Sequence, residues 1–172
     1  SENTLILAFI SPELAKDPGP LEELSKQYPK SKMIGCSTAG EISGSRITDN
    51  SISVAVVQFD KTRLEILKTP VNSSEDSLQA GEEISKTLDA PDLRSILVLS
   101  DGLNVNGTEL VKGLNKINKP NVVITGGLAG DGDRFKETWV IYDGKTYKNT
   151  VAALALYGEA IQIGFSSQGG WD

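Results

Sequence analysis

Two short loops share an order of residue types that could bind a small molecule. The first is Gly35–Glu41, which reads Gly-Cys-Ser-Thr-Ala-Gly-Glu, and the second is Gly126–Asp131, which reads Gly-Gly-Leu-Ala-Gly-Asp. Glycines let the backbone approach a ligand, hydroxyls and backbone amides can bind an anion, and the final acid can accept a hydrogen bond from an ammonium group. A zwitterion such as an amino acid would match both ends of each loop.

The candidate ligand-binding residues are the glycines, hydroxyls and acids of these loops, with one acid from a third strand end. They are Gly35, Cys36, Ser37, Thr38, Gly40, Glu41, Asp101, Gly126, Gly127, Gly130 and Asp131. A purely structural role for the same residues stays open, because glycine-rich turns commonly connect secondary-structure elements, and acids after strands often accept hydrogen bonds from nearby amides.

Cys36 stands where a nucleophile would be well placed, but the sequence contains no histidine. Cysteine and serine hydrolases nearly always need an imidazole base, so the usual triads are impossible. We therefore predict that Cys36 is a small buried residue lining a pocket and that the chain is not an enzyme. Two alternatives stay open: an enzyme using Cys36 or the acids Glu41, Asp101 and Asp131, and a protein interaction module without a small ligand.

Neither a metal nor an organic cofactor is expected. Asp131 and Asp133 alternate as calcium ligands can, but no glutamate follows at the spacing of a calcium-binding loop. A Walker-type phosphate loop and a dinucleotide fingerprint are also missing, since the glycines of residues 126–132 lead toward a hairpin and not a helix.

Composition and charge exclude several classes of partner. With 38% hydrophobic and 23% charged residues, the 172-residue chain resembles an ordinary folded protein, and its net charge of -6 disfavours nucleic acid. The longest apolar stretches, Leu5–Ile10 and Val151–Tyr157, fall far short of the roughly 20 residues of a membrane helix. The single cysteine fits a reducing compartment, so we expect a cytoplasmic location without membrane insertion.

The elements that must position these loops form two similar series. The first series is predicted as a strand, a helix, a strand and a hairpin, at Thr4–Ile10, Pro20–Tyr28, Met33–Cys36, and Ile52–Phe59 with Arg63–Thr69. A connecting helix is predicted over Ser74–Leu88.

The second series repeats this order with an additional hairpin. Its two strands are predicted at Ser95–Ser100 and Val122–Thr125, and the helix between them, capped by Asn106, at Thr108–Ile117. The additional hairpin, Thr138–Tyr142 with Lys145–Tyr147, turns at Asp143-Gly144. The closing strand pair is predicted at Val151–Tyr157 with Ala160–Phe165.

The repeated order predicts an α/β fold with mixed β-sheets flanked by helices, built from duplicated halves at about residues 1–70 and 95–172 that the helix 74–88 joins. The halves should be related by pseudo-twofold symmetry, with a four-layer αββα sandwich as the specific expectation. The triplets Ala39-Gly40-Glu41 and Ala129-Gly130-Asp131 would then lie on the same side of the fold and approach each other.

Four motifs together resemble the N-terminal region of FIST domain proteins. They are Gly35–Ile42, Ser100–Leu103, Gly126–Gly132 and Gly169-Gly170-Trp171, and their order spans nearly the whole chain. The resemblance implies one domain over residues 1–172, a bacterial or archaeal sensory module for signal transduction that binds a small ligand, with amino acids as the expected class.

The resemblance also implies partners: a C-terminal FIST region beyond the chain end, and a signalling output module in cis or in trans. Some FIST relatives are regarded as haem-dependent gas sensors. With no histidine, this sequence lacks the commonest axial ligand, and haem is not expected here.

Overall fold

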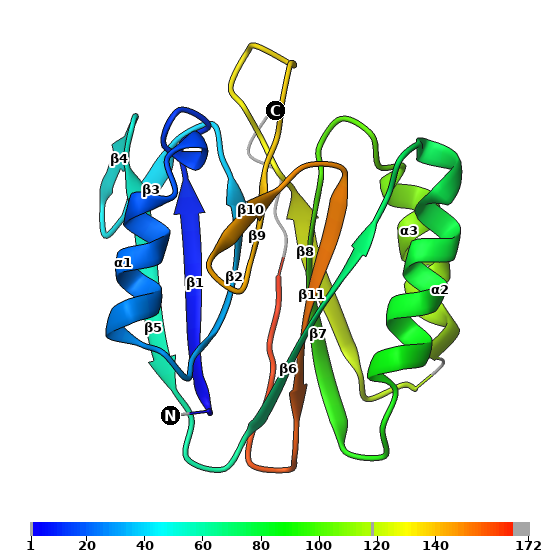
Figure 1. Ribbon diagram of the computed structural model, residues 1–172. Helices are drawn as coiled ribbons and strands as arrows, with labels where there is room; N and C mark the ends of the chain where they lie inside the picture. The colour runs from blue at the N-terminus through cyan, green and yellow to red at the C-terminus, as the bar shows by residue number, and fades with distance from the viewer. Residues whose placement is uncertain (1, 118, 167–172) are drawn as a thin grey trace.

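The computed structural model describes residues 2–117 and 119–166, which form four layers (Figure 1). Helix α1 (Gly19–Gln27) covers the outer face of a five-stranded sheet. Helices α2 (Ser77–Leu88) and α3 (Gly107–Leu114) cover the outer face of a four-stranded sheet. The inner faces of the sheets pack on each other, so the predicted α/β fold with helices outside the sheets is confirmed.

The first sheet has the strand order β10-β9-β2-β1-β5. Its strands are β1 (Thr4–Ile10), β2 (Lys32–Ser37), β5 (Ile52–Gln58), β9 (Val140–Tyr142) and β10 (Lys145–Tyr147). Strands β1 and β2 are parallel, whereas β5 runs antiparallel to β1 and β9 runs antiparallel to β2.

The second sheet has the strand order β6-β11-β7-β8. Its strands are β6 (Arg63–Pro70), β7 (Leu93–Ser100), β8 (Val123–Leu128) and β11 (Thr150–Tyr157). Strands β7 and β8 are parallel, and β11 runs antiparallel to both β6 and β7. A separate hairpin of β3 (Glu41–Ser43) and β4 (Arg46–Thr48) stands beside the start of β5.

The two series of elements interlock. The orders β2-β1-β5 and β8-β7-β11 have the same pairing, a parallel pair followed by an antiparallel strand. Strand β6, which follows β5 in the chain, joins the second sheet, and strands β9 and β10, which follow β8, join the first sheet. Each sheet therefore contains strands from both parts of the sequence.

Each interface between layers has its own apolar cluster. Ile34 and Leu154 lie in the cluster between the sheets, and Ile6 packs with Leu21 of α1 on the outer side of the first sheet. On the outer side of the second sheet, α2 and α3 pack closely. A Cβ atom at Gly81 of α2 would lie only 2.3 Å from the carbonyl oxygen of Leu110 in α3. This glycine lets the two helices share one apolar seam.

The predicted hairpin of residues 52–59 and 63–69 is wrong in its pairing. Both strands exist, but β5 pairs with β1 and β6 pairs with β11 in the other sheet. Leu64 of β6 packs between the sheets while Leu67 packs toward α2 and α3, so β6 has apolar contacts on both of its faces. A strand with two apolar faces belongs inside a layered core and not in a local hairpin.

The predicted closing pair is half wrong. Strand β11 forms as expected, but residues 160–165 form no strand. Ile161 and Ile163 are half-buried against the cluster between the sheets, and their exposed neighbours give the alternation that suggested a strand. Residues 161–164 therefore alternate between half-buried and exposed positions without pairing to another strand.

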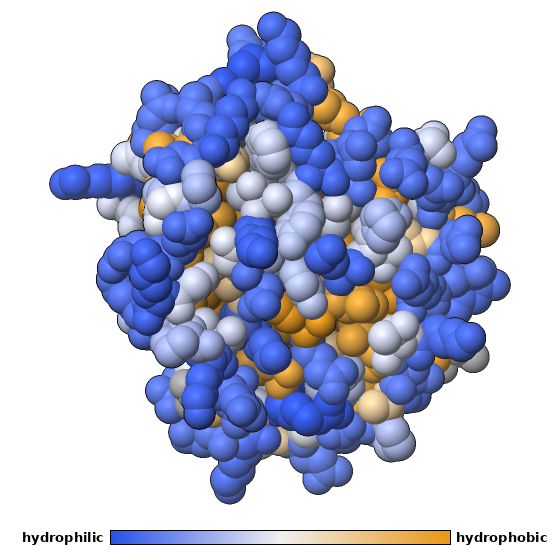
Figure 2. Space-filling model, viewed as in Figure 1, coloured by the Kyte–Doolittle hydropathy of each residue, from blue (hydrophilic) through white to orange (hydrophobic). Residues whose placement is uncertain are grey.

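Other predictions agree with the structure. The hairpin β9–β10 turns at Asp143 and Gly144, whose φ angles of 49° and 77° are the positive values that a tight hairpin needs. The Asn106 side chain accepts a 3.2 Å hydrogen bond from the Glu109 amide and caps α3, as the sequence predicts. Motif Gly169-Gly170-Trp171 lies outside the described residues. In the described part, every helix is too short or too polar to span a bilayer. Hydrophilic residues cover most of the face in Figure 2, and apolar residues show mainly near its centre.

Candidate functional site

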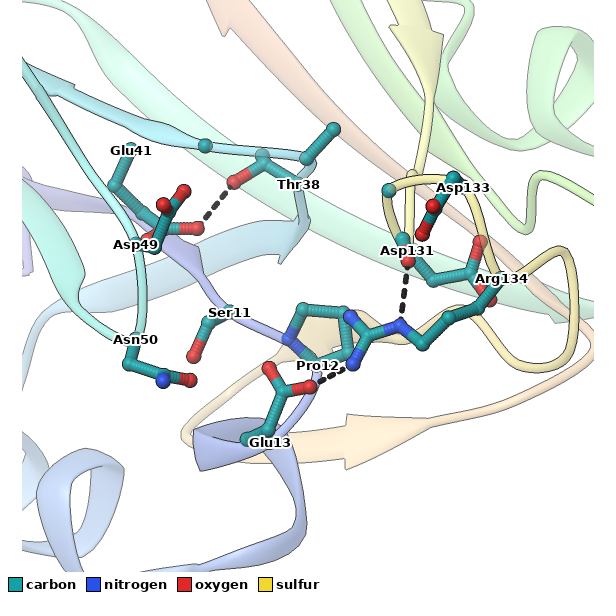
Figure 3. A pocket seen from close by; sticks show the side chains of 13 residues that line it. Ser11, Pro12, Glu13, Thr38, Glu41, Asp49, Asn50, Asp131, Asp133 and Arg134 are labelled. Carbon is teal, nitrogen blue, oxygen red and sulfur yellow. Dashed lines mark hydrogen bonds and ion pairs between the residues drawn. The ribbon is translucent and has the colours of Figure 1, made fainter.

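A cavity of about 280 Å³ opens beyond the carboxyl ends of β1, β2 and β8 (Figure 3). It is formed by the loop after each of these strands and by the turn before β5. Its lining residues are Ser11, Pro12, Glu13, Thr38, Ala39, Gly40, Glu41, Asp49, Asn50, Asp131, Gly132, Asp133 and Arg134. The carboxyl ends of parallel strands are the usual position for ligand sites in α/β proteins.

The two glycine-containing loops meet at this cavity. The backbone amide of Gly130 donates a 2.9 Å hydrogen bond to the carbonyl oxygen of Ser37, and the Ser37 hydroxyl accepts a 2.9 Å hydrogen bond from the Trp139 amide. A Cβ atom at Gly130 would come within 3.4 Å of the Ala39 nitrogen. The prediction that the two loops lie on one side of the fold and approach each other is confirmed.

Ion pairs also connect the loop after β1 to the loop after β8. The Arg134 guanidinium pairs with Glu13, and Lys16 pairs with Glu137, which accepts a further 2.5 Å hydrogen bond from Lys148. Hydrogen bonds from Lys148 and then Lys16, with the positive charge of both, lower the pKa of Glu137 to about 2. These pairs are partly or largely exposed, so they contribute little to the free energy of unfolding.

Glu41 is a buried carboxylate on the wall of the cavity. The residue is only 2% exposed, and its carboxylate oxygens accept hydrogen bonds from the Thr38 hydroxyl at 2.7 Å, the Ser51 hydroxyl at 2.9 Å and the Ser51 amide at 3.3 Å. Across residues 2–117 and 119–166, no lysine or arginine forms an ion pair with it. Its charge is thus held by neutral donors alone.

Asp131 organises its own loop. The residue is 3% exposed, and its carboxylate accepts hydrogen bonds from the amides of Phe135 at 3.1 Å, Lys136 at 2.7 Å and Glu137 at 3.0 Å. Burial opposes ionisation, but these backbone hydrogen bonds outweigh it and hold the pKa of Asp131 below its usual value. The same residue's carbonyl oxygen accepts a 2.8 Å hydrogen bond from Arg134 Nε.

Asp101 lies outside the cavity and joins three segments of chain. It is 2% exposed and accepts hydrogen bonds from the Asn104 amide at 2.7 Å, the Thr138 hydroxyl at 2.9 Å and the Asn149 amide at 3.4 Å. Next to it, a Cβ atom at Gly102 would lie 2.0 Å from the carbonyl oxygen of Ala129. This third strand end therefore packs behind the second loop.

The cavity is strongly acidic. Of its described lining residues, Arg134 is the one cation, and it is already paired with Glu13 (Figure 3). The carboxylates on the wall are Glu13, Glu41, Asp49, Asp131 and Asp133. Such a site favours a ligand with a positive group.

The remaining predicted site residues lie elsewhere. Cys36 is buried in the cluster between the sheets and does not line the cavity; burial raises the pKa of its thiol to about 12. Gly35 lies against β1, where a Cβ atom would be 1.8 Å from the Ala8 carbonyl oxygen. Gly126 and Gly127 line a different cavity of about 670 Å³ between β8 and α3.

Several lining residues have no place in the sequence prediction. Glu13 comes from the loop after β1, Asp49 and Asn50 come from the turn before β5, and Arg134 lies just past the predicted second loop. The sequence could have predicted Glu13, because it follows β1, whose carboxyl end adjoins that of its parallel neighbour β2. Asp49 and Arg134 had none, since their positions depend on how distant loops fold together.

The fold and the cavity define an α/β sandwich domain with a small acidic site between repeated loops. The family model of the FIST N domain matches residues 4–172. The chain therefore belongs to the FIST N domain family, whose domains are sensory signal-transduction domains and are not generally catalytic. A search of curated proteins gave no match.

Proposed function

We propose that this chain is a sensory module whose acidic cavity binds a small ligand carrying an ammonium group, with amino acids as the expected class. The observation that carries the proposal is the Glu41 carboxylate, which is buried on the cavity wall without a cationic partner in the described residues. A buried charge is costly unless an opposite charge or hydrogen bonds compensate it. An ammonium group would supply that charge.

Glu41 also has capacity for another hydrogen bond. A carboxylate offers about four acceptor positions, and the Thr38 hydroxyl, the Ser51 hydroxyl and the Ser51 amide use fewer than that. Asp131 also accepts three hydrogen bonds, but all three come from backbone amides that fix its loop, whereas two of the three donors to Glu41 are hydroxyls that can rotate. We therefore assign the ammonium contact to Glu41 and a loop-ordering role to Asp131.

The carboxylate of the ligand needs donors that the fold leaves free. The amides of Ser37, Thr38 and Gly130 bond to Trp139, Ile10 and Ser37. Ala39 and Gly40 follow β2 on the cavity wall, and in the described part of the chain their amides have no hydrogen-bond partner. We assign the ligand carboxylate to these two amides and to the Arg134 guanidinium.

The size of the cavity limits the ligand. Sites for drug-sized ligands span about 300–1,000 Å³, so a cavity of about 280 Å³ suits a small metabolite. A nucleotide or a haem would exceed it. The buried thiol of Cys36, with its pKa of about 12, is unsuited to nucleophilic chemistry, and we propose binding without catalysis.

A thermal-shift comparison tests this function. The purified chain is incubated with a panel of amino acids and with the matching 2-hydroxy acids, which keep the carboxylate and lack the ammonium group. Binding to the native state raises the melting temperature, so at least one amino acid should raise it while its 2-hydroxy acid does not. Equal shifts for both members of each pair, or no shift for any compound, would contradict the proposal.

Regulation requires a route from the cavity to an output. We propose that ligand binding is transmitted to a C-terminal FIST region and to a signalling output module, in cis or in trans, in the cytoplasm. The ion pairs Glu13–Arg134 and Lys16–Glu137 support this view, because they span the loops that a ligand would draw together.

A further inference from the structure

We propose that β5 is an interface strand to which a second copy of this chain pairs, antiparallel and across a twofold axis, so that the first sheets of both copies become one continuous sheet. This inference is independent of the ligand proposed above. It starts from the edge position of β5, whose one strand neighbour in the described chain is β1 (Figure 1).

The free edge of β5 has a defined set of backbone groups. The Phe59 amide bonds to the Asn3 carbonyl at 3.0 Å, and the Ser11 amide bonds to the Ser51 carbonyl at 3.0 Å, so odd-numbered positions face β1. Hydrogen-bonding directions alternate along an antiparallel strand. The N–H and C=O groups of the even-numbered positions therefore point outward: Ile52, Val54, Val56 and Gln58.

This edge lacks the features that usually prevent pairing. Strand β5 reads Ile-Ser-Val-Ala-Val-Val-Gln, with no charge and no proline, and its register with β1 is uninterrupted. Val54, Val56 and Val57 are 37%, 43% and 38% exposed. Natural edge strands are normally protected by charges, proline, bulges or a covering element.

Neighbouring residues enlarge the apolar edge. Ile42 and Ile47 of the β3–β4 hairpin are 65% and 72% exposed. The hairpin lies beside the beginning of β5, because the Ser53 hydroxyl donates a 2.7 Å hydrogen bond to the Ile42 carbonyl oxygen. Exposed apolar residues therefore lie both on the edge strand and on the hairpin beside it.

The equivalent strand of the second sheet is fully covered. Strand β11 is buried along its whole length, since β6 pairs with its other edge and α2 packs over it. No counterpart of β6 or α2 covers β5 in the described residues, and the single helix α1 covers the first sheet. Strand β5 can therefore pair on a second edge as β11 does, but in the described residues no strand occupies that edge.

A second copy fits this edge because the strand is complementary to itself. In an antiparallel register centred on Ala55, Val54 of one copy faces Val56 of the other, and Ile52 faces Gln58. This register pairs every outward-pointing backbone group of the strand and places Val54 beside Val56, a favourable β-branched pair. The small side chain of Ala55 meets its own copy at the closely spaced centre, as a twofold axis requires.

Charges at the two ends of β5 agree with antiparallel pairing. Exposed Lys61 follows the strand, and exposed Asp49 precedes it. Reversing the direction of the second copy brings the end that carries Lys61 toward the end that carries Asp49. A parallel arrangement would instead bring each charge toward its own copy.

Charge variants at Ala55 test both the interface and its register. Sedimentation of the whole chain over a range of concentrations should show a reversible dimer. Ala55→Lys and Ala55→Glu each place like charges opposite each other on the axis and should weaken the dimer by about a hundredfold. Mixing the two variants should restore dimerisation through an opposite pair.

The matched control is Val111→Lys, which introduces a charge at a residue that is 51% exposed on α3 and should leave the dimer unchanged. Circular dichroism and melting temperature confirm that each variant is folded. A wild-type chain that stays monomeric would overturn the proposal. So would a dimer that tolerates both single variants, or a mixture of the two variants that stays monomeric.

Discussion

The amide of Gly130 donates its hydrogen to the carbonyl oxygen of Ser37 over 2.9 Å, and this contact joins loops that lie far apart in the sequence. It connects the end of β2 in the first sheet to the loop after β8 in the second sheet. The cavity lies on the same side, between Thr38 and Asp131. The repeated loop is thus the place where the two sheets are joined and where a ligand would contact both.

The close approach of Gly102, after β7, to Ala129, after β8, gives a prediction for stability. Gly102→Ala should lower the free energy of unfolding by about 2 kcal/mol or more, because the new Cβ atom would lie 2.0 Å from the Ala129 carbonyl oxygen. Gly107→Ala is the control, since a Cβ atom there has no atom within 4 Å. It should leave stability unchanged or raise it by up to about 1 kcal/mol. Chemical denaturation measures both, and equal stabilities would contradict the prediction.

The sequence predicts local features of the fold well and strand partners poorly. Short apolar runs predict the strands β1 and β7, and the Asn106–Glu109 spacing predicts the start of α3. The apolar segments on either side of Asp60 and Lys61 predict β5 and β6 as strands, but they do not specify that the two strands belong to different sheets. That choice depends on the burial of both faces of β6, which only the assembled layers provide.

The candidate site divides in the same way. The repeated triplet predicts that Glu41 and Asp131 lie near one another, and both line the cavity. Residue type does not reveal that the Asp131 carboxylate accepts hydrogen bonds from the amides of residues 135–137, because the loop conformation brings those donors together. Nor does it reveal Asp49, which reaches the cavity only after β5 has paired with β1.

Cys36 should be inert in the folded chain. Burial raises the pKa of its thiol to about 12, so the reactive thiolate is scarce at neutral pH. A disulfide reagent at pH 8 should label the native chain only as it unfolds, and label it fully and rapidly in denaturant. Rapid stoichiometric labelling of the native chain would contradict this prediction and reopen a catalytic role. The Cys36→Ala variant is the blank.

Asp131 should make stability depend on acidity. Its pKa is lowered from the ordinary value of 3.8, so the folded state binds this proton more weakly than the unfolded state. The resulting stabilisation is complete above the unfolded-state pKa and is lost as the pH falls through the lower, folded-state pKa. In urea unfolding between pH 6 and pH 2, the stability difference between wild type and Asp131→Asn should be constant near pH 6 and should narrow below about pH 4.

Asp133→Asn provides the control for that measurement. Asp133 is an exposed neighbour on the same loop, and in the described residues it accepts none of the hydrogen bonds that order residues 135–137. Its substitution should change stability by less than about 0.5 kcal/mol. A pH-independent difference between wild type and Asp131→Asn would refute the linkage.

The roles of Glu41 and Asp131 should separate when binding and stability are measured together. Glu41→Gln removes the charge that meets the ligand ammonium while keeping the side-chain shape. Because charge-assisted hydrogen bonds contribute about 1.5–3 kcal/mol, affinity for an amino acid that binds the wild type should fall roughly ten- to hundredfold. Asp131→Asn should instead lower the melting temperature, because an amide cannot accept from all three of its backbone donors.

Calorimetric titration and thermal unfolding of both variants distinguish these effects. Affinity per folded molecule should change much less in Asp131→Asn than in Glu41→Gln, because the Asp131 carboxylate is fixed by backbone amides of its own loop. Asp49→Asn, on the same cavity wall, tests whether any loss of negative charge is sufficient. If Asp49→Asn weakens binding as much as Glu41→Gln, the cavity attracts the ligand by its overall charge. If neither Glu41→Gln nor Asp131→Asn changes the affinity, both acids lie outside the binding site.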